Sequence, residues 1–165
     1  MARTVTSTTG GAKERALRLL AVRSRSRAEL ARRLRMAGFD PAHAEEAIAD
    51  LEAVGLVDDE RLAQELATHE IERRGFGRRA ALSSLRRLGI GSELAERSVG
   101  DALGTKDDEE ARAEEVARAR LRRLSGLAPE VAYRRLLGFL QRRGYDGETA
   151  RAVCRRVLAQ PADSI

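Results

Sequence analysis

The chain has 165 residues, 42% of them hydrophobic, and a formal net charge of +5, which suits one or two ordinary domains or a short stack of repeats. Aromatic residues account for only 3% and Trp is missing, so any core must be built mainly from aliphatic side chains. Charged residues reach 35%, prolines number three, and no window of strand length alternates apolar with polar residues, which argues against sheets and favours helices.

Residues 1–11 are polar and small, and we expect a disordered tail there. This segment lacks the apolar stretch of a secretion signal, and no window approaches the roughly 18 apolar residues of a membrane span. We therefore expect a cytoplasmic protein without membrane contact. The single cysteine, Cys154, lies in a helical pattern and is expected to be a small buried side chain rather than a reactive thiol.

Residues 12–57 carry three predicted helices. The apolar face of the first consists of Ala16, Leu19, Leu20 and Val22. The second begins at a capping box, in which the Ser26 hydroxyl and the Glu29 carboxylate each take a backbone amide, and it ends at Gly38. The third begins with a cap and a first-turn proline, Asp40-Pro41, and ends near residue 55.

Two further segments repeat this layout. Residues 58–104 predict helices over 58–74, 78–88 and 92–103. Residues 105–160 predict a helix that starts at a box of Thr105 and Asp108 and ends near residue 124, and then helices over 129–143 and 146–160.

A glycine followed by an apolar residue ends the middle helix of every segment, at Gly38, Gly89 and Gly144. The intervals are 51 and 55 residues, which is long enough for three helices in each copy. Each short helix has one apolar stripe that only a neighbour can cover. The predicted fold is therefore all-α, with three tandem three-helix repeats, about nine helices in total, in an elongated and curved stack.

Positive and negative charges alternate in blocks along the chain. Residues 13–35 hold nine basic and two acidic side chains, whereas residues 36–60 hold no basic and eight acidic ones. Residues 71–90 hold six basic and one acidic, and residues 91–110 hold two and seven. Residues 111–143 are basic again, with nine basic and three acidic side chains. If the copies stack in register, the basic helices can align into a stripe that suits a polyanion or an acidic groove on another protein.

This stripe has two competing interpretations. Arginine supplies 29 of the 31 basic residues, and its guanidinium grips phosphate or carboxylate through two parallel hydrogen bonds, which favours a binding surface. The alternative is that basic and acidic helices pack side by side and neutralise one another in exposed ion pairs of small energetic value. A codon bias would also explain the arginine content.

The sequence contains no catalytic or metal-binding constellation, so neither an enzyme activity nor a cofactor is predicted. His43 and His69 are the only histidines, and each lies in a charged helical stretch without a second ligand at metal-binding spacing. The acidic run at residues 58–60 lies at a helix start, where carboxylates offset the helix dipole. We interpret these groups as surface and structural residues.

Four segments, taken in order, match a family pattern. They are LLAVRSRSRAEL at 19–30, GLVDDERLA at 55–63, RGFGRRAALSSLRRLGI at 74–90 and LQRRGY at 140–145. Together with the threefold repeat, these motifs resemble the RecX regulatory proteins of bacteria, and the match extends over residues 13–158.

The resemblance implies a non-enzymatic modulator of the RecA recombinase, built from three repeats of three helices. Such proteins lie in the groove of the RecA–DNA filament and limit its extension or promote its loss. They thereby dampen strand exchange, ATP turnover and co-protease activity in DNA repair and the SOS response. On this chain we assign the filament contact to Arg25, Arg27, Arg32, Arg35, Arg78, Arg79, Arg86, Arg87, Arg142 and Arg143.

Two other functions stay open. A pI near 10.2 permits a helical module that binds single- or double-stranded DNA directly, although Glu45, Glu46 and Asp50 would face phosphates unfavourably. A helical adaptor for an unrelated protein is the third possibility. No apolar face is left over for a dimer, and a monomer is predicted.

Overall fold

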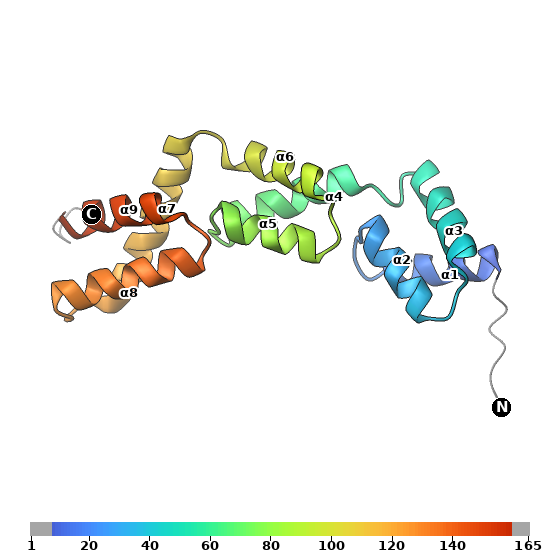
Figure 1. Ribbon diagram of the computed structural model, residues 1–165, viewed down its shortest axis with the longest axis horizontal. Coiled ribbons are helices and arrows are strands. Elements are labelled where there is room, and N and C mark those ends of the chain that lie inside the picture. Colours follow the sequence, from blue (N-terminus) through green and yellow to red (C-terminus); the bar gives the residue numbers. More distant parts are fainter. Residues whose placement is uncertain (1–7, 160–165) are drawn as a thin grey trace, which may run out of the picture.

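The computed structural model describes residues 8–159, and this part of the chain is all-α. Its helices form three consecutive triplets along the long axis of the molecule (Figure 1). The first contains α1 (Thr9–Leu20), α2 (Arg27–Met36) and α3 (Pro41–Ala53). The second contains α4 (Asp59–Thr68), a π-helical continuation (His69–Arg73), α5 (Arg78–Arg87) and α6 (Ser92–Leu103). The third contains α7 (Lys106–Leu121), a 3-10 turn (Arg122–Leu124), α8 (Pro129–Arg142) and α9 (Gly147–Ala159).

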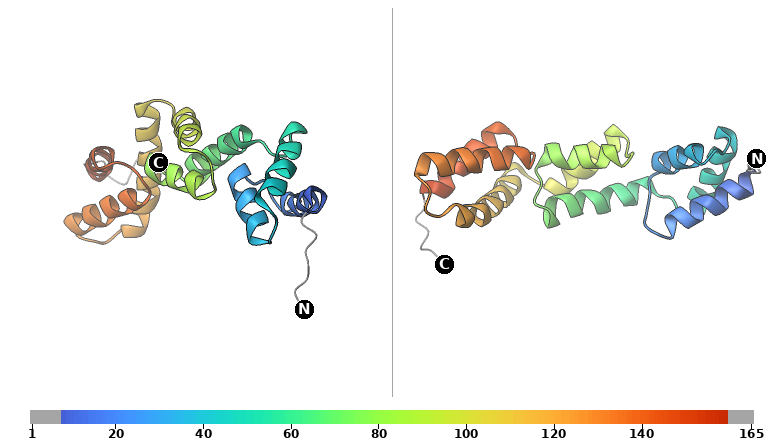
Figure 2. Two further views of the ribbon diagram at one scale, coloured as in Figure 1. Left: turned by 45° about the vertical axis from the view of Figure 1, so that its right-hand side comes forward. Right: turned by 90° about the horizontal axis from the view of Figure 1, so that it is seen from below.

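Each triplet encloses a core of its own, and in each one the first helix packs against the third. The three cores are almost entirely aliphatic, as the composition predicted, with Tyr145 as the large aromatic exception. Their largest fully buried side chains are Leu30, Leu34, Ile48, Leu51, Ile71, Leu85, Val99, Leu136, Leu140 and Val153. The expectation of an all-α protein built from tandem three-helix units is confirmed, and the units stay in line when viewed from below (Figure 2).

Local capping chemistry explains most helix starts. Ser26, Asp40 and Asp58 each accept a hydrogen bond from an amide in the first turn of the helix that follows. The predicted box at the start of α7 is complete, because Thr105 Oγ1 accepts from the Asp108 amide at 3.2 Å and Asp108 Oδ2 accepts from the Thr105 amide at 2.9 Å. The box predicted at Ser26 is only half formed: Ser26 Oγ takes the amide of Glu29 at 3.1 Å, but the Glu29 carboxylate binds arginines instead.

The first helix begins earlier and ends earlier than the sequence suggested. Thr8 Oγ1 accepts from the Gly11 amide at 3.2 Å, so α1 starts inside the segment assigned to the tail, of which residues 1–7 lie outside the described range. At the other end, Arg25 Nε donates to the Leu19 carbonyl at 3.1 Å and satisfies the end of α1. Val22 therefore lies beyond the helix and is 78% exposed, so its place on the apolar face was wrong.

Equivalent elements meet at both junctions between triplets, although the hydrogen bonds that join them differ. The glycine turn after α5 meets the start of α2, where Ser26 Oγ donates to the Leu88 carbonyl at 2.6 Å. The glycine turn after α8 meets the start of α5, where the Gly77 and Arg79 amides donate to the carbonyls of Arg143 and Gly144 at 2.9 and 3.1 Å. A Cβ on Gly144, whose φ is +90°, would lie 2.3 Å from the amide nitrogen of Ala80. Glycine is needed there for its left-handed backbone and for close approach.

Candidate functional site

Arg25 is structural rather than part of an accessible surface. Its side chain is only 7% exposed and pairs with the buried carboxylate of Glu29. Arg23 and Arg33 bind the same carboxylate at 2.8 Å. Burial alone would raise the pKa of Glu29, but hydrogen bonds from Arg33, Arg23 and Arg25 outweigh it and hold the pKa below 4.5. We therefore leave Arg25 out of any proposed contact surface.

Three of the other assigned arginines form ion pairs inside their own triplet. Arg27 on α2 pairs with Glu45 and Glu52 of α3. Arg78 and Arg86 on α5 both bind the carboxylate of Glu96 on α6, at 2.7 and 2.8 Å. For these positions the packing of a basic helix beside an acidic one accounts for the charge pattern.

The other surface arginines assigned from the sequence are exposed and form no ion pair within residues 8–159. They lie on the middle helices of the three triplets and are Arg32, Arg35, Arg79, Arg87 and Arg142. Arg32 and Arg35 are three residues apart on α2 and share one side of that helix. Their guanidinium groups remain available to an anionic partner.

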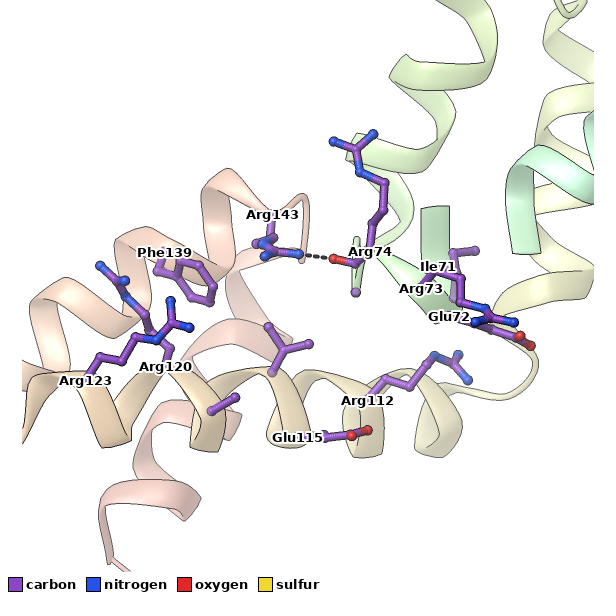
Figure 3. Close-up of a pocket in the computed structure, with 13 residues that line it drawn as sticks. Ile71, Glu72, Arg73, Arg74, Arg112, Glu115, Arg120, Arg123, Phe139 and Arg143 are labelled. Carbon is purple, nitrogen blue, oxygen red and sulfur yellow. Dashed lines mark hydrogen bonds between the residues drawn. The ribbon is translucent and has the colours of Figure 1, made fainter. Parts of the chain in front are cut away.

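Arg143 belongs to a different feature, an arginine-lined cavity of about 340 Å³ between the second and third triplets. The walls come from the π-helical end of α4 and the turn after it, from α7 with its 3-10 turn, and from α8 (Figure 3). Six arginines and two glutamates line it: Arg73, Arg74, Arg112, Arg120, Arg123, Arg143, Glu72 and Glu115.

Several of these guanidinium groups are held in place by contacts within the protein. The Arg143 side chain donates to the Arg74 carbonyl across the junction, and Arg112 donates to the Leu103 carbonyl. The Cζ atoms of Arg120 and Arg143 each lie 5.2 Å from the ring centroid of Phe139, which is within cation–π range. Arg74 is paired with Glu70 at 3.0 Å. The cavity is thus a preorganised array of donors with excess positive charge.

Sequence reasoning found only Arg143 among these residues. The basic block at 111–143 was visible as a charge count, but it gave no reason to select Arg112, Arg120 or Arg123. Their convergence depends on the docking of one triplet on the next, because Arg73 and Arg74 come from a different repeat. The one local signal was Gly75-Phe76-Gly77, a turn with basic residues on both sides.

The remaining candidate features concern a reactive thiol, a metal site and a membrane-spanning helix. Cys154 is fully buried, as predicted, and burial raises the pKa of its thiol to about 11, so little thiolate exists at neutral pH. In the part of the chain that the structure describes, no three or more potential metal ligands gather together. No helix there has the length and apolar character to cross a bilayer.

Comparison with known proteins identifies the family. The family models for the first and third three-helix domains of RecX match residues 12–51 and 107–154. "Regulatory protein RecX" of Amycolatopsis mediterranei is 37% identical over 149 residues, which is 90% of this chain and 84% of that protein. The protein of the same name from Mycobacterium sp. strain KMS is 40% identical over 140 residues, 81% of this chain and 74% of that one. The crystal structure of RecX from Lactobacillus salivarius has the same fold, with a TM-score of 0.76 and 19% identity over 90% of this chain and 96% of that one. The chain belongs to the RecX family.

Proposed function

We propose that this protein is a non-catalytic regulator that acts in the cytoplasm on the RecA–DNA filament and lowers the recombinase, ATPase and co-protease activities of RecA. Membership of the RecX family supports this proposal, since the relatives carry the name "Regulatory protein RecX". Such a role belongs to DNA repair and the SOS response. The protein acts as a monomer on this proposal.

The observation that carries the proposal is the distribution of unpaired arginines over an elongated stack. The middle helices α2, α5 and α8 each present exposed guanidinium groups without an ion pair to any described residue, at Arg32, Arg35, Arg79, Arg87 and Arg142. A long molecule with cations in each triplet touches a polymeric partner at several points. Each contact is weak alone, but linked contacts add through effective concentration.

The experiment replaces unpaired arginines and measures inhibition of the DNA-stimulated ATPase of RecA. Arg79→Glu with Arg87→Glu should raise the concentration for half-inhibition about tenfold, since two exposed contacts of ~0.7 kcal/mol each amount to one decade. Arg151→Glu with Arg155→Glu on α9 is the matched control, with the same change in net charge and equally exposed positions. Equal inhibition by both folded variants removes Arg79 and Arg87 from the contact surface.

A second candidate function is direct binding of nucleic acid, and the arginine cavity favours it. The acidic helix α3 counts against a groove-reading mode, because Glu45, Glu46 and Asp50 are exposed on it and repel phosphates. Binding to bare DNA and to a RecA–DNA filament, compared at one moderate salt concentration, separates the two candidates. Preference for the filament supports the regulator, and equal binding supports the DNA module.

A further inference from the structure

The cavity between the second and third triplets concentrates positive charge that the protein itself does not neutralise. Of its six arginines only Arg74 forms an ion pair within the described chain. The other five are Arg73, Arg112, Arg120, Arg123 and Arg143. Elsewhere, arginines such as Arg27, Arg78 and Arg156 face a glutamate of a neighbouring helix. The cavity therefore gathers five arginines without an ion pair to any described residue at one place, whereas the unpaired arginines of α2, α5 and α8 are spread over the surface.

Arg120 adds an observation that is independent of the charge count. Its Nε atom is buried and has no hydrogen-bond partner. An unsatisfied buried donor is costly, and such groups in folded proteins call for an explanation. The Arg120 guanidinium lies against the Phe139 ring and lines the cavity, so its orientation is set by packing before any anion enters (Figure 3).

The chemistry of the lining favours phosphate over a single carboxylate. Six arginines against two glutamates leave an excess of four positive charges, which one carboxylate would not balance. Guanidinium edges match phosphate oxygens through paired hydrogen bonds, and their planes stack on flat rings. The volume of about 340 Å³ lies within the range of small-ligand sites and exceeds the need of one carboxylate group.

We propose that this cavity is a phosphate-binding site, which takes the phosphates of a single-stranded nucleic acid or of a free nucleotide. Arg120 and Arg123 of the third triplet are its principal ligands, and Arg73 of the second triplet lies at the other end of the cavity (Figure 3). An extended anion that spans the cavity relieves the repulsion of guanidinium groups that belong to different repeats. Phosphate binding therefore braces the junction as well as filling the cavity.

The test uses purified full-length protein without RecA, so its outcome does not depend on the proposed regulatory function. Binding of tripolyphosphate, ATP and a deoxythymidine oligonucleotide is measured by calorimetry at low salt, with polyglutamate as the carboxylate probe. The variant is Arg120→Gln with Arg123→Gln. The control is Arg134→Gln with Arg135→Gln on α8, which removes the same charge from exposed residues that lie outside the cavity.

The cavity variant should bind the phosphate probes at least about tenfold more weakly, since it loses two charge-assisted contacts, and the control should change less than about twofold. For the oligonucleotide, the slope of log affinity against log salt should become shallower by about 1.4, from two contacts at about 0.7 each. Binding of the oligonucleotide alone identifies a strand as the source, and binding of ATP and tripolyphosphate identifies free nucleotides.

Three results would overturn the proposal. The first is that the wild-type protein binds no phosphate probe. The second is that the cavity variant and the control bind the phosphate probes equally well. The third is polyglutamate binding as tightly as the phosphate probes and weakening in the cavity variant, which would assign the cavity to an acidic protein. Circular dichroism of both variants must match the wild type, and Arg123→Gln alone serves if the double variant fails to fold.

Discussion

At the scale of single residues, Glu29 is the clearest case of a charge on which the fold depends. Its carboxylate is 3% exposed and holds Arg25, which is 7% exposed, together with the half-exposed Arg23 and Arg33. A buried ion pair adds little over a well-packed apolar pair, but removal of one partner leaves the other charge buried and uncompensated.

Glu29→Gln should lower the free energy of unfolding by about 3 kcal/mol at pH 7, because Arg25 stays charged in the core. The pKa of Glu29 lies below 4.5 in the folded protein, so its stabilising contribution is complete above about pH 4.5 and disappears as the pH falls through the folded value. Urea unfolding at pH 7 and pH 3 measures both effects. Glu14→Gln, at a position 71% exposed, should change stability by less than about 0.5 kcal/mol, and an equal loss at both sites would refute the assignment.

The sequence predicted the position of Glu29 but not its role. A Ser and a Glu three residues apart match a capping box, and that local pattern correctly located the start of α2. It could not show that the carboxylate would turn inward, since Arg23 and Arg25 reach it only after the chain between α1 and α2 has folded back. Arg33, four residues further on the same helix, was the available local hint.

At the scale of helices and turns, Gly38 and Gly144 form a natural pair for comparison. Both end a middle helix with a left-handed backbone, at φ values of +88° and +90°. A Cβ on Gly38 would meet nothing within 4 Å, whereas one on Gly144 would collide with the backbone of Ala80. The difference exists because no triplet precedes the first one within the described chain.

Gly38→Ala should lose about 1 kcal/mol, which is the cost of a left-handed alanine. Gly144→Ala should lose about 2 kcal/mol more, because the added methyl group forces the second and third triplets apart. Chemical denaturation of the two variants in parallel gives the difference. Similar losses of stability in both variants would show that the backbone at Ala80 shifts without an energetic penalty. Gly144 would then be needed only for the conformation of its own turn.

Helix boundaries were well predicted because the signals are local. The cap and proline at Asp40-Pro41, Pro129 at the start of α8 and the range Ser92–Leu103 all agree with the structure. The junctions were not predicted, because a glycine that permits a turn and a glycine that permits close approach look alike in sequence. Gly38 and Gly144 illustrate this ambiguity.

At the scale of the whole molecule, some arginines of the basic blocks form ion pairs with a neighbouring helix and others form none among the described residues. The excess of arginine on α5 is partly cancelled by Glu96 of α6, whereas Arg79 and Arg87 on the same helix form no ion pair among the described residues. Counting charges along the chain predicted the totals but not the ion-pair partners, because partners depend on the rotation of each helix about its axis. Charge counting therefore indicated basic helices and overstated the number of free cations.

The phosphate proposal has a consequence for the rigidity of the assembly. Saturating tripolyphosphate should slow hydrogen exchange of the Gly77 and Arg79 amides, which donate across the second junction, by about tenfold at ten times the dissociation constant. The Arg27 amide, which donates to Asp59 at the first junction at 2.8 Å, is the internal control and should not change. Equal slowing at both junctions would indicate general stabilisation by the anion rather than a local brace.

At each junction a glycine turn contacts the start of the middle helix in the preceding triplet, and this contact limits which changes in chain length the fold can accept. A short insertion within one triplet displaces its turn from the neighbour, as the crowding of Gly89 against Ser26 and of Gly144 against Ala80 makes clear. A complete additional triplet brings its own turn and its own helix start, and it reproduces the joint on either side. We therefore expect the fold to accept a complete added triplet more readily than a short insertion inside one.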